Sequence, residues 1–298
     1  MITEETLKHY RNKITYAQNR EDLLLESFFV EKKKGFYVDV GAYDPDYDSV
    51  TRLFYTRGWI GINIEPQLAQ YEKFLKRRPK DININAAVGT KKGTKTLRVY
   101  KSGGLSTLSD KIKEQYLHTK NSSTDEWQDT KVKIVPLKEV FVQNKVTKID
   151  FMKVDVEGFE REVLESNDWK KFRPDVLCIE AGFSASETRK FLQSKGYNRV
   201  FNDGLNDYYV EKGFSHKELP FIEHVLIRRG GGIRYEDFDN ANKFYKYSKK
   251  VEKELAETIR KLELENSTLK QTLADRRALL RKSLKMYAKG SEKNGSSK

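Results

Sequence analysis

The feature that most constrains the fold of this chain is a nine-residue stretch, GFYVDVGAY, at residues 35–43. Residues 36–40 have the apolar pattern of a short buried strand, which carries one acid, Asp39, near its end. Gly41 follows at the turn, where the absence of a Cβ lets the backbone approach a ligand closely. A buried strand, an acid and a glycine turn in this order indicate the opening of a ligand-binding α/β domain.

A second strand pattern, WIGINI at residues 59–64, ends in Glu65 and Pro66. Glu65 follows Asp39 by 26 residues, close to the gap of about 20 residues between the glycine turn and the ribose-binding acid of a dinucleotide fold. This spacing predicts a ligand that contains adenosine. The alternative is that the acid only caps the helix that follows.

Strand and helix patterns alternate along the chain as far as residue 211. The expected strands are 36–40, 61–64, 82–86, 148–154, 175–179, 197–201 and 207–211, and the expected helices are 19–31, 68–77, 160–164 and 187–195. This alternation predicts a doubly wound, parallel α/β sheet that finishes with a hairpin around NDGLN and an antiparallel strand. Residues 100–135 form a polar insertion, and a loop of that length is expected to be functional or disordered.

The composition narrows the class of protein. A formal charge of +13 favours an anionic partner, whether a nucleic acid, an anionic lipid or a phosphorylated glycan carrier, without choosing among them. The single cysteine, Cys178, lies in an apolar run, which excludes a disulfide framework and indicates a reducing compartment. No apolar run approaches the roughly 18 residues of a membrane span, and residues 1–10 lack a hydrophobic signal region. We therefore expect a cytoplasmic protein.

Ligands of doubly wound sheets bind beyond the carboxyl ends of the strands. The side chains expected at that edge are Asp39, Gly41, Glu65, Asn85, Ala86, Lys153, Asp155, Glu157 and Glu180. Acids at four of these strand ends are unsuited to a phosphate cradle, and the sequence has no glycine-rich phosphate motif. An uncharged or cationic ligand with ribose hydroxyls fits better, and S-adenosylmethionine has both a ribose and a sulfonium.

The segment KVDVEG at residues 153–158 carries the candidate chemistry. Asp155 is the candidate general base, because a carboxylate within hydrogen-bond reach can take the proton of an attacking alcohol. Lys153 would tune this base, and Glu157 or Glu180 would orient the acceptor hydroxyl. The alternative is a structural ion pair between Lys153 and Glu157, with Asp155 only holding the cofactor.

A divalent cation is left undecided by the sequence. Carboxylate oxygens suit Mg²⁺, so Asp155, Glu157 and Glu180 could hold one. The histidines, four in number, have no metal-ligand spacing, and no metal site is assigned from them.

Four motifs together resemble the FkbM family of S-adenosylmethionine-dependent methyltransferases. They are FYVDVGAYDP at 36–45, GINIEP at 61–66, NAAVG at 85–89 and KVDVEGFEREVL at 153–164. The resemblance runs from about Tyr16 to Val210, and it implies a seven-stranded class I methyltransferase fold, Rossmann-like in its winding. It also implies O-methylation, often of sugars in antibiotics, glycolipids or surface polysaccharides. Tyr43 departs from the pattern, because the family more often has Asn after VGA.

The resemblance further implies roles for individual residues in binding the cofactor. Asp39 and Gly41 would lie along its methionine part and ribose, with Ala42 beside them. Glu65, next to Pro66, would accept hydrogen bonds from both ribose hydroxyls. The remaining implied contacts are Asn85 or Ala86 at the adenine, Gln18 and Asp22 at the methionine end, and Ser106 and Thr107 near the active site.

Two other classes of function stay open. A nucleic-acid ribose 2′-O-methyltransferase would also use a lysine and acids, although the sequence shows neither an RNA-binding module nor a DPPY motif, which makes nucleic acid the less favoured partner. A coiled-coil assembly protein that keeps a cofactor-binding domain is the second. The favoured acceptor is a small-molecule or glycan hydroxyl.

Four segments are expected along the chain. They are a methyltransferase domain at 1–212, a flap or linker packing on it at 213–250, a coiled-coil helix at 251–285 and a basic disordered tail at 286–298.

The coiled coil is predicted from a heptad pattern. Ile259, Asn266, Leu273 and Leu280 occupy a positions, and Leu255, Leu262 and Leu269 occupy d positions. Leucine at d with one Asn at a favours a parallel dimer. From Arg276 to Lys298 there are eight basic residues against one acid, which predicts contact of this end with an anionic membrane, on the inner face.

Overall fold

The computed structural model describes residues 14–29, 32–101, 104–118, 124–182, 185–214 and 233–234, and, further on, 257, 260–261, 264–268, 270–271, 273 and 276–277. The chain divides into two compact units, residues 1–237 and residues 238–298. The predicted boundaries at 212, 250 and 285 stay predictions.

The first unit is organised by a seven-stranded sheet in the order β10-β11-β9-β8-β2-β3-β4. The strands are β2 (Phe36–Val40), β3 (Ile60–Ile64), β4 (Ile82–Ile84), β8 (Phe151–Val154), β9 (Val176–Glu180), β10 (Tyr197–Asn202) and β11 (Asn206–Glu211). All neighbours pair in parallel except β11, which is antiparallel to both β9 and β10. The predicted doubly wound sheet with a terminal hairpin and an antiparallel strand is confirmed.

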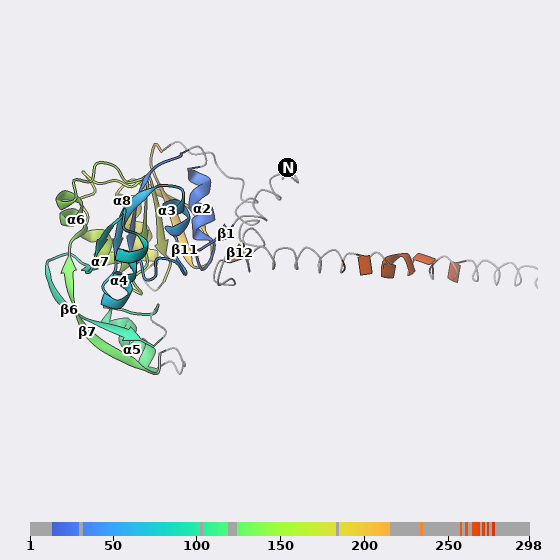
Figure 1. Cartoon of the computed structure of the whole chain (residues 1–298), viewed down its shortest axis with the longest axis horizontal. Helices are drawn as coiled ribbons and strands as arrows, with labels where there is room; N and C mark the ends of the chain where they lie inside the picture. Colours follow the sequence, from blue (N-terminus) through green and yellow to red (C-terminus); the bar gives the residue numbers. More distant parts are fainter. Residues whose placement is uncertain are drawn as a thin grey trace, which may run out of the picture. The chain divides into compact units, whose positions relative to one another are not determined.

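Helices cover both faces of this sheet (Figure 1). On one face α2 (Glu21–Phe28) and α3 (Arg52–Thr56) bury Leu23, Leu24 and Phe54 against Phe151 of β8. On the other face α6 (Leu137–Gln143), α7 (Glu160–Glu165) and α8 (Ala185–Ser194) pack on the alternate residues of the same strands. Because the central strands are covered on both faces, they need continuous apolar runs, and these runs made them predictable. One further helix, α4 (Leu68–Arg77), lies between β3 and β4 in the chain.

The chain changes direction at the boundary between β2 and β8. From β2 it winds outward through β3 to β4, and from β8 it winds the opposite way through β9. A crevice forms outside the carboxyl ends of the strands where the winding direction reverses. The site is therefore expected beyond Val40 and Val154, the last residues of these two strands.

The prediction of a long loop over residues 100–135 is wrong. This region contributes α5 (Asp110–His118) and β7 (Trp127–Val135), which pairs with β5 (Ala87–Val88) and with β6 (Gly93–Tyr100) in a separate three-stranded sheet. In Figure 1, β6, β7 and α5 lie together beyond one end of the large sheet. One face of this small sheet carries Leu97, Val132 and Ile134 into an apolar cluster. Lys and Thr recur at the other positions, so the apolar alternation is weak in the sequence.

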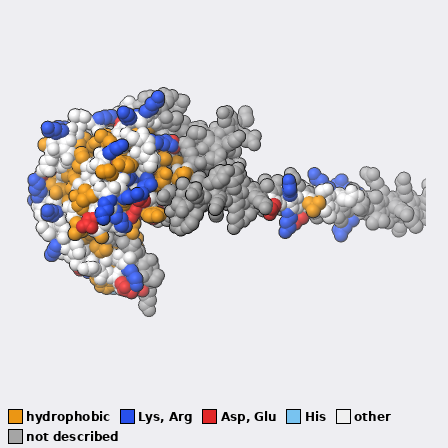
Figure 2. All heavy atoms as spheres, viewed as in Figure 1, with side chains coloured by type: hydrophobic (Ala, Val, Ile, Leu, Met, Phe, Trp, Pro, Cys, Tyr) orange, Lys and Arg blue, Asp and Glu red, His pale blue; other side chains and the backbone are white. Residues whose placement is uncertain are grey.

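The small sheet and α5 are called the insert below. Figure 2 shows Lys and Arg side chains spread over the visible face of the first unit. A two-stranded parallel pair, β1 (Ile14–Thr15) with β12 (Ile233–Arg234), joins the start of the described chain to residues beyond the large sheet. Among the described helices, none has both the length and the apolar character to span a membrane.

In the second unit, described residues such as Asn266 and Leu273 are helical. The other a and d positions of the predicted coiled coil, and the basic tail at 286–298, lie outside the described residues. The dimer and the membrane contact therefore stay predictions.

Candidate active site

A cavity opens at the carboxyl edge of the large sheet. The strand ends contribute Gly41, Tyr43, Glu65, Pro66, Ala86 and Asp155, and the loop after β8 adds Glu157 and Phe159. Leu97, Gly104, Ser106 and Leu108 line it from the segment that contains the insert. The cavity is therefore bounded by the strand ends of the large sheet and by the segment that contains the insert. The sequence predicted the strand ends and not the insert.

Gly41 lies at the point where β2 and β8 end side by side. Its φ of +78° is in the left-handed region, and a Cβ at this position would lie 1.9 Å from the backbone oxygen of Asp155. A side chain would therefore push the two strand ends apart. The contact shown is with the end of β8, and the predicted approach of a ligand to Gly41 stays a prediction.

Glu65 faces the cavity from the end of β3 with its carboxylate held by backbone donors. The N–H of Tyr43 donates to Oε2 at 2.8 Å, and the N–H of Gln67 donates to Oε1 at 2.7 Å. Each carboxylate oxygen can accept a second hydrogen bond. Burial raises the pKa of Glu65 to about 7, against the lowering effect of these two N–H groups. The carboxylate is thus fixed in position and ready for further donors.

Tyr43 contributes to this end of the cavity through its backbone. Its φ of 53° is left-handed, a conformation that Asn adopts more readily than Tyr. The departure from the family pattern at this position therefore leaves the turn intact, and the backbone N–H makes the contact to Glu65. We refer to Gly41, Tyr43, Glu65 and Pro66 as the Glu65 end of the cavity.

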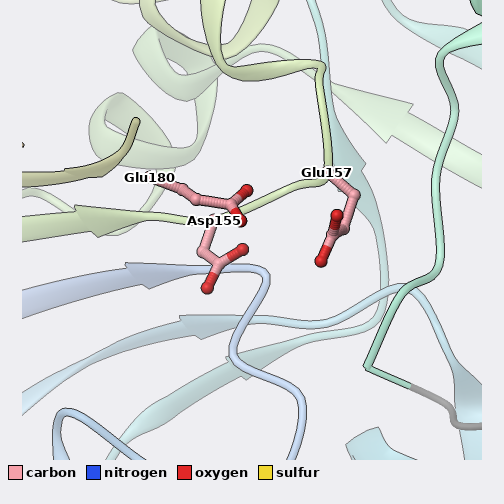
Figure 3. A group of neighbouring side chains, drawn as sticks. All are labelled: Asp155, Glu157 and Glu180. Carbon is pink, nitrogen blue, oxygen red and sulfur yellow. The ribbon is translucent and has the colours of Figure 1, made fainter. Parts of the chain in front are cut away.

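Asp155, Glu157 and Glu180 form an acid cluster whose oxygen atoms lie within 4.8 Å of one another. Figure 3 shows Asp155 and Glu180 side by side at neighbouring strand ends, with Glu157 on the loop that follows Asp155. The pKa of Glu157 is raised to about 8 and that of Glu180 to about 10. Burial is the larger cause for both groups, and the negative charge of Asp155 is the second. At neutral pH these two carboxyls therefore retain protons.

Lys153 of β8 supplies positive charge to the acid cluster through its contact with Asp155. Its side chain is 9% exposed, and Nζ lies 3.1 Å from Oδ2 of Asp155. Burial alone would lower the pKa of Lys153, but the carboxylates of Asp155, Asp39 and Glu21 raise it above its ordinary value. Its ion pair is with Asp155, not with Glu157 as the alternative interpretation of the sequence had it. The pairing places a positive charge beside the Asp155 carboxyl.

Several predicted site residues lie beside the cavity and support it. Asn85 donates from Nδ2 to the backbone oxygens of Glu65 and Pro66, both at 3.0 Å, so that it fixes the turn after β3. Thr107 donates to the backbone oxygen of Glu157 at 2.6 Å, where Glu157 has a left-handed φ of 52°. Ala42 is buried next to Gly41. Of the implied adenine contacts, Ala86 lines the cavity and Asn85 does not.

Five further predicted residues also lie outside the cavity lining, and two of them, Lys153 and Glu180, adjoin it through Asp155. Asp39 is buried and accepts a hydrogen bond from Thr51 at 3.0 Å, while its Oδ1 accepts none from the described residues. Asp22 is buried, and its carboxylate accepts from Thr15 and from backbone N–H groups. Gln18 is exposed. The structure thus does not bring Asp22 or Gln18 to the cavity, and their roles stay predictions.

Tyr116 is a site residue that the sequence did not indicate. It projects from α5, and its hydroxyl lies 3.3 Å from Oε2 of Glu157. Ser106 is also near this side, where it accepts a hydrogen bond from Gln67 at 3.3 Å. A signal for Tyr116 exists in hindsight: it is the residue one turn after Ile112, the buried anchor of α5.

The acid cluster is close enough for one divalent cation to contact all three carboxylates. Hard oxygen donors of this kind fit Mg²⁺ or Ca²⁺. The short separations equally fit a cluster that shares protons, so the geometry does not assign a cation.

The sheet order and the acid-lined cavity at the reversal of winding define a doubly wound α/β protein with a candidate ligand site at its strand ends. The model of the Methyltransferase FkbM domain matches residues 39–199. The chain belongs to this family.

Solved structures give a more distant likeness. The methyltransferase FkbM from Methylobacillus flagellatus KT is 10% identical with a TM-score of 0.39, and the alignment covers 69% of this chain and 58% of that one, less than two thirds of its length. TrmK of M. capricolum in complex with S-adenosyl-homocysteine is 14% identical over 78% of this chain and 81% of that one, with a TM-score of 0.38. The Methanococcus jannaschii fibrillarin pre-rRNA processing protein is 16% identical over 61% of this chain and 68% of that one, with a TM-score of 0.34. No curated protein matches the chain.

Proposed function

We propose that the protein is an S-adenosylmethionine-dependent O-methyltransferase that methylates a sugar hydroxyl of a glycan or glycoconjugate. The observation that supports this most is that Glu65 and Asp155 line one cavity on either side of Gly41. In this proposal the first carboxylate receives the ribose diol of the cofactor, and the second receives the proton of the acceptor hydroxyl. The proposal assigns these two tasks to the two ends of the cavity.

The Glu65 end fits the nucleoside part of the cofactor. Two oxygens held by backbone N–H groups can accept the two hydroxyls of a ribose, and charge-assisted hydrogen bonds of this kind are about twice as strong as neutral ones. Ala86, Leu108 and Phe159 give the same cavity an apolar part that suits adenine. S-adenosylmethionine, when bound, supplies an electrophilic methyl group on a sulfonium.

The acid cluster fits the acceptor. Asp155, which is ion-paired with Lys153, takes the proton of the acceptor hydroxyl as the new carbon–oxygen bond forms. Glu157 and Glu180, which retain protons at neutral pH, donate hydrogen bonds to neighbouring oxygens and so hold the acceptor in line.

Labelled S-adenosylmethionine and a panel of glycan and nucleoside acceptors, read by mass spectrometry, test the proposal. Methyl transfer to a saccharide hydroxyl is the expected result. Methyl transfer to ribose 2′-hydroxyls of RNA would favour the rival enzyme. Absence of cofactor binding would favour an assembly protein.

A further inference from the structure

Glu157 is the member of the acid cluster whose position depends most on its neighbours. Asp155 directly follows β8 and Glu180 ends β9, whereas Glu157 lies on the loop after β8 (Figure 3). The Glu157 backbone has a left-handed φ of 52°. A residue with a Cβ keeps such a conformation only where the surrounding structure holds it. The contacts of this loop therefore decide where the Glu157 carboxyl lies in the cavity.

The segment that joins β6 to β7 holds this loop through three residues. Thr107 donates from Oγ1 to the backbone oxygen of Glu157 at 2.6 Å, and the Tyr116 hydroxyl donates to Oε2 of Glu157 at 3.3 Å. Ile112 packs so closely on Gly158 that a Cβ on this glycine would lie 2.5 Å from the Ile112 Cγ1. The loop that carries Glu157 is thus fixed by a part of the chain outside the large sheet.

Tyr116 is held in place and stays a hydrogen-bond donor. Its ring lies edge-on to Tyr100, with centroids 5.3 Å apart. Burial, followed by the charge of Glu157, raises the pKa of the Tyr116 hydroxyl, so this group keeps its proton. A protonated carboxyl has one oxygen that carries the proton and one that accepts hydrogen bonds. Because Oε2 of Glu157 accepts from Tyr116, the proton of Glu157 belongs on Oε1.

We propose that Thr107 and Tyr116 are positioning residues, which hold Glu157 in place and direct its acidic proton, through Oε1, to the acceptor hydroxyl. The inference rests on the proposed function, in which Glu157 donates a hydrogen bond to the acceptor. Neither Thr107 nor Tyr116 transfers a proton itself. Their loss should therefore impair the alignment of the acceptor and leave the Glu65 end of the cavity unchanged.

The protonation of Glu157 reports on the contact with Tyr116. The charged and titratable groups that face the acid cluster around Glu157 come from the end of β8, from α7, from β9 and from α5, and they are Lys153, Asp155, Glu160, Glu180 and Tyr116. Burial is the largest cause of the raised pKa of Glu157, and the charges of Asp155 and Glu160 add to it. The hydrogen bond from Tyr116 and the charge of Lys153 act in the opposite direction. Loss of the Tyr116 hydroxyl should therefore raise the pKa of Glu157 further.

Tyr116→Phe tests this contact, because it keeps the ring that packs on Tyr100 and removes only the hydroxyl. Carbon-13 NMR of the glutamate carboxyls follows the titration of Glu157 in the full chain, and Glu157→Gln identifies its signal. In Tyr116→Phe the pKa of Glu157 should rise by about one pH unit, since the charged form loses a donor. Tyr71→Phe, at a half-buried position of α4 outside the cavity lining, is the matched control and should leave the titration unchanged.

A pair of variants at Thr107 tests the second contact. Thr107→Val removes the hydroxyl that donates to Glu157, and Thr107→Ser retains it. With the acceptor found in the panel described above, kcat should fall by about tenfold in Thr107→Val and in Tyr116→Phe, with little change in affinity for S-adenosyl-homocysteine. Thr107→Ser should keep most of the kcat. In Tyr116→Phe the loss of turnover at alkaline pH should also move to higher pH, because Glu157 acts in its protonated form.

Three results would overturn these roles. An unchanged or lowered pKa of Glu157 in Tyr116→Phe would remove the role of Tyr116, and equal losses of kcat in Thr107→Val and Thr107→Ser would remove that of Thr107. Unmodified kcat in both Tyr116→Phe and Thr107→Val would remove both. Chemical denaturation of the same preparations shows whether each variant folds. Absence of S-adenosyl-homocysteine binding by the unmodified chain would instead contradict the proposed function, because the titration of Glu157 is measured without cofactor.

Discussion

The Glu65 end of the cavity and the acid cluster differ in how their charges are satisfied. At the Glu65 end both carboxylate oxygens already accept backbone N–H groups. In the acid cluster three carboxyls crowd within 4.8 Å and share one lysine, Lys153, whose ion pair is with Asp155. The first arrangement is built before any ligand arrives. The second brings three carboxyls together, and burial raises the pKa of two of them, so the same cavity combines a prepared binding end with a reactive end whose protonation depends on pH.

The largest expected effect concerns the reactive end. Asp155→Asn keeps the shape of the side chain but loses the proton acceptor, so turnover should fall by about 10²- to 10⁴-fold. Affinity for S-adenosyl-homocysteine should change far less. Asp168→Asn makes the same chemical change at an exposed position and should leave both quantities unaltered. Equal losses of turnover and affinity in Asp155→Asn would assign this residue to binding alone.

The next effect tests the contact between Gly41, at the Glu65 end, and the backbone of Asp155, in the acid cluster. Gly41→Ala places a methyl group against the backbone oxygen of Asp155 and also strains a left-handed residue. Gly58→Ala, at a φ of +86° with no atom within 4 Å of the added carbon, isolates the strain. Both variants should unfold more easily than the unmodified chain in denaturant, Gly58→Ala by about 1 kcal/mol and Gly41→Ala by clearly more. Equal losses would mean that the strand ends are not in close contact.

A third effect exploits the repulsion within the acid cluster. The pKa of Glu180 is raised from 4.5 to about 10, so the folded chain binds this proton more tightly than the unfolded chain. Stability from this group is therefore lost as pH rises above its unfolded pKa. Glu180→Gln does not titrate, so it should gain at least about 1 kcal/mol over the unmodified chain by about pH 8, and less near pH 5.

Chemical denaturation across this pH range measures that gain. Glu72→Gln on the exposed surface of α4 is the control and should show no gain at any pH. A Glu180→Gln variant that is less stable than the unmodified chain at high pH would show that the carboxyl is satisfied in the folded state, contrary to the comparison drawn above.

A smaller effect is expected at the prepared end. The pKa of Glu65 is raised to about 7, mainly by burial. The charge of Asp39 acts in the same direction as burial, and the charge of Lys153 acts in the opposite direction. The ionised form accepts the ribose hydroxyls, so affinity for S-adenosyl-homocysteine should fall by about tenfold between about pH 8 and about pH 6. Glu65→Gln should bind more weakly and lose most of this pH dependence. An unchanged pH profile in Glu65→Gln would place the titrating group elsewhere.

The smallest effect on the cavity is expected from the second unit. A chain that ends at Asp237 keeps β12 and every described cavity residue, so its cofactor affinity should equal that of the full chain. The predicted coiled coil would make the full chain a dimer and the shortened chain a monomer by light scattering. Equal monomer masses would discard the coil. Sedimentation of the full chain with anionic liposomes, and not of the shortened chain, tests the membrane contact.

The two ends also differ in how much the sequence revealed. The strand ends that carry Gly41, Glu65, Asp155 and Glu180 were predictable, because buried parallel strands are apolar runs and an acid at their end stands out. The side formed by the insert was not. Its strands are exposed on one face and rich in Lys and Thr, so neither their pairing nor the approach of Tyr116 to Glu157 left a clear pattern.

Polar residues next to the site were the hardest to assign. Asn85, Thr107 and Asp22 are of types that bind ligands as often as they hold turns, and their sequence neighbours do not distinguish the two roles. In the structure, the side chain of each residue forms hydrogen bonds with backbone groups or with a neighbouring hydroxyl. Contacts between segments far apart in the chain decide such roles, and a single sequence does not contain them.

The central claim is that Glu65 receives the ribose diol of S-adenosylmethionine. Calorimetric titration of the unmodified chain and of Glu65→Ala with S-adenosyl-homocysteine, with NAD as the competing ligand, tests it most directly. We predict that the unmodified chain binds S-adenosyl-homocysteine and not NAD, and that Glu65→Ala binds it more weakly by about 1–3 kcal/mol. Binding of NAD instead, or equal affinity in the two chains, would contradict the account.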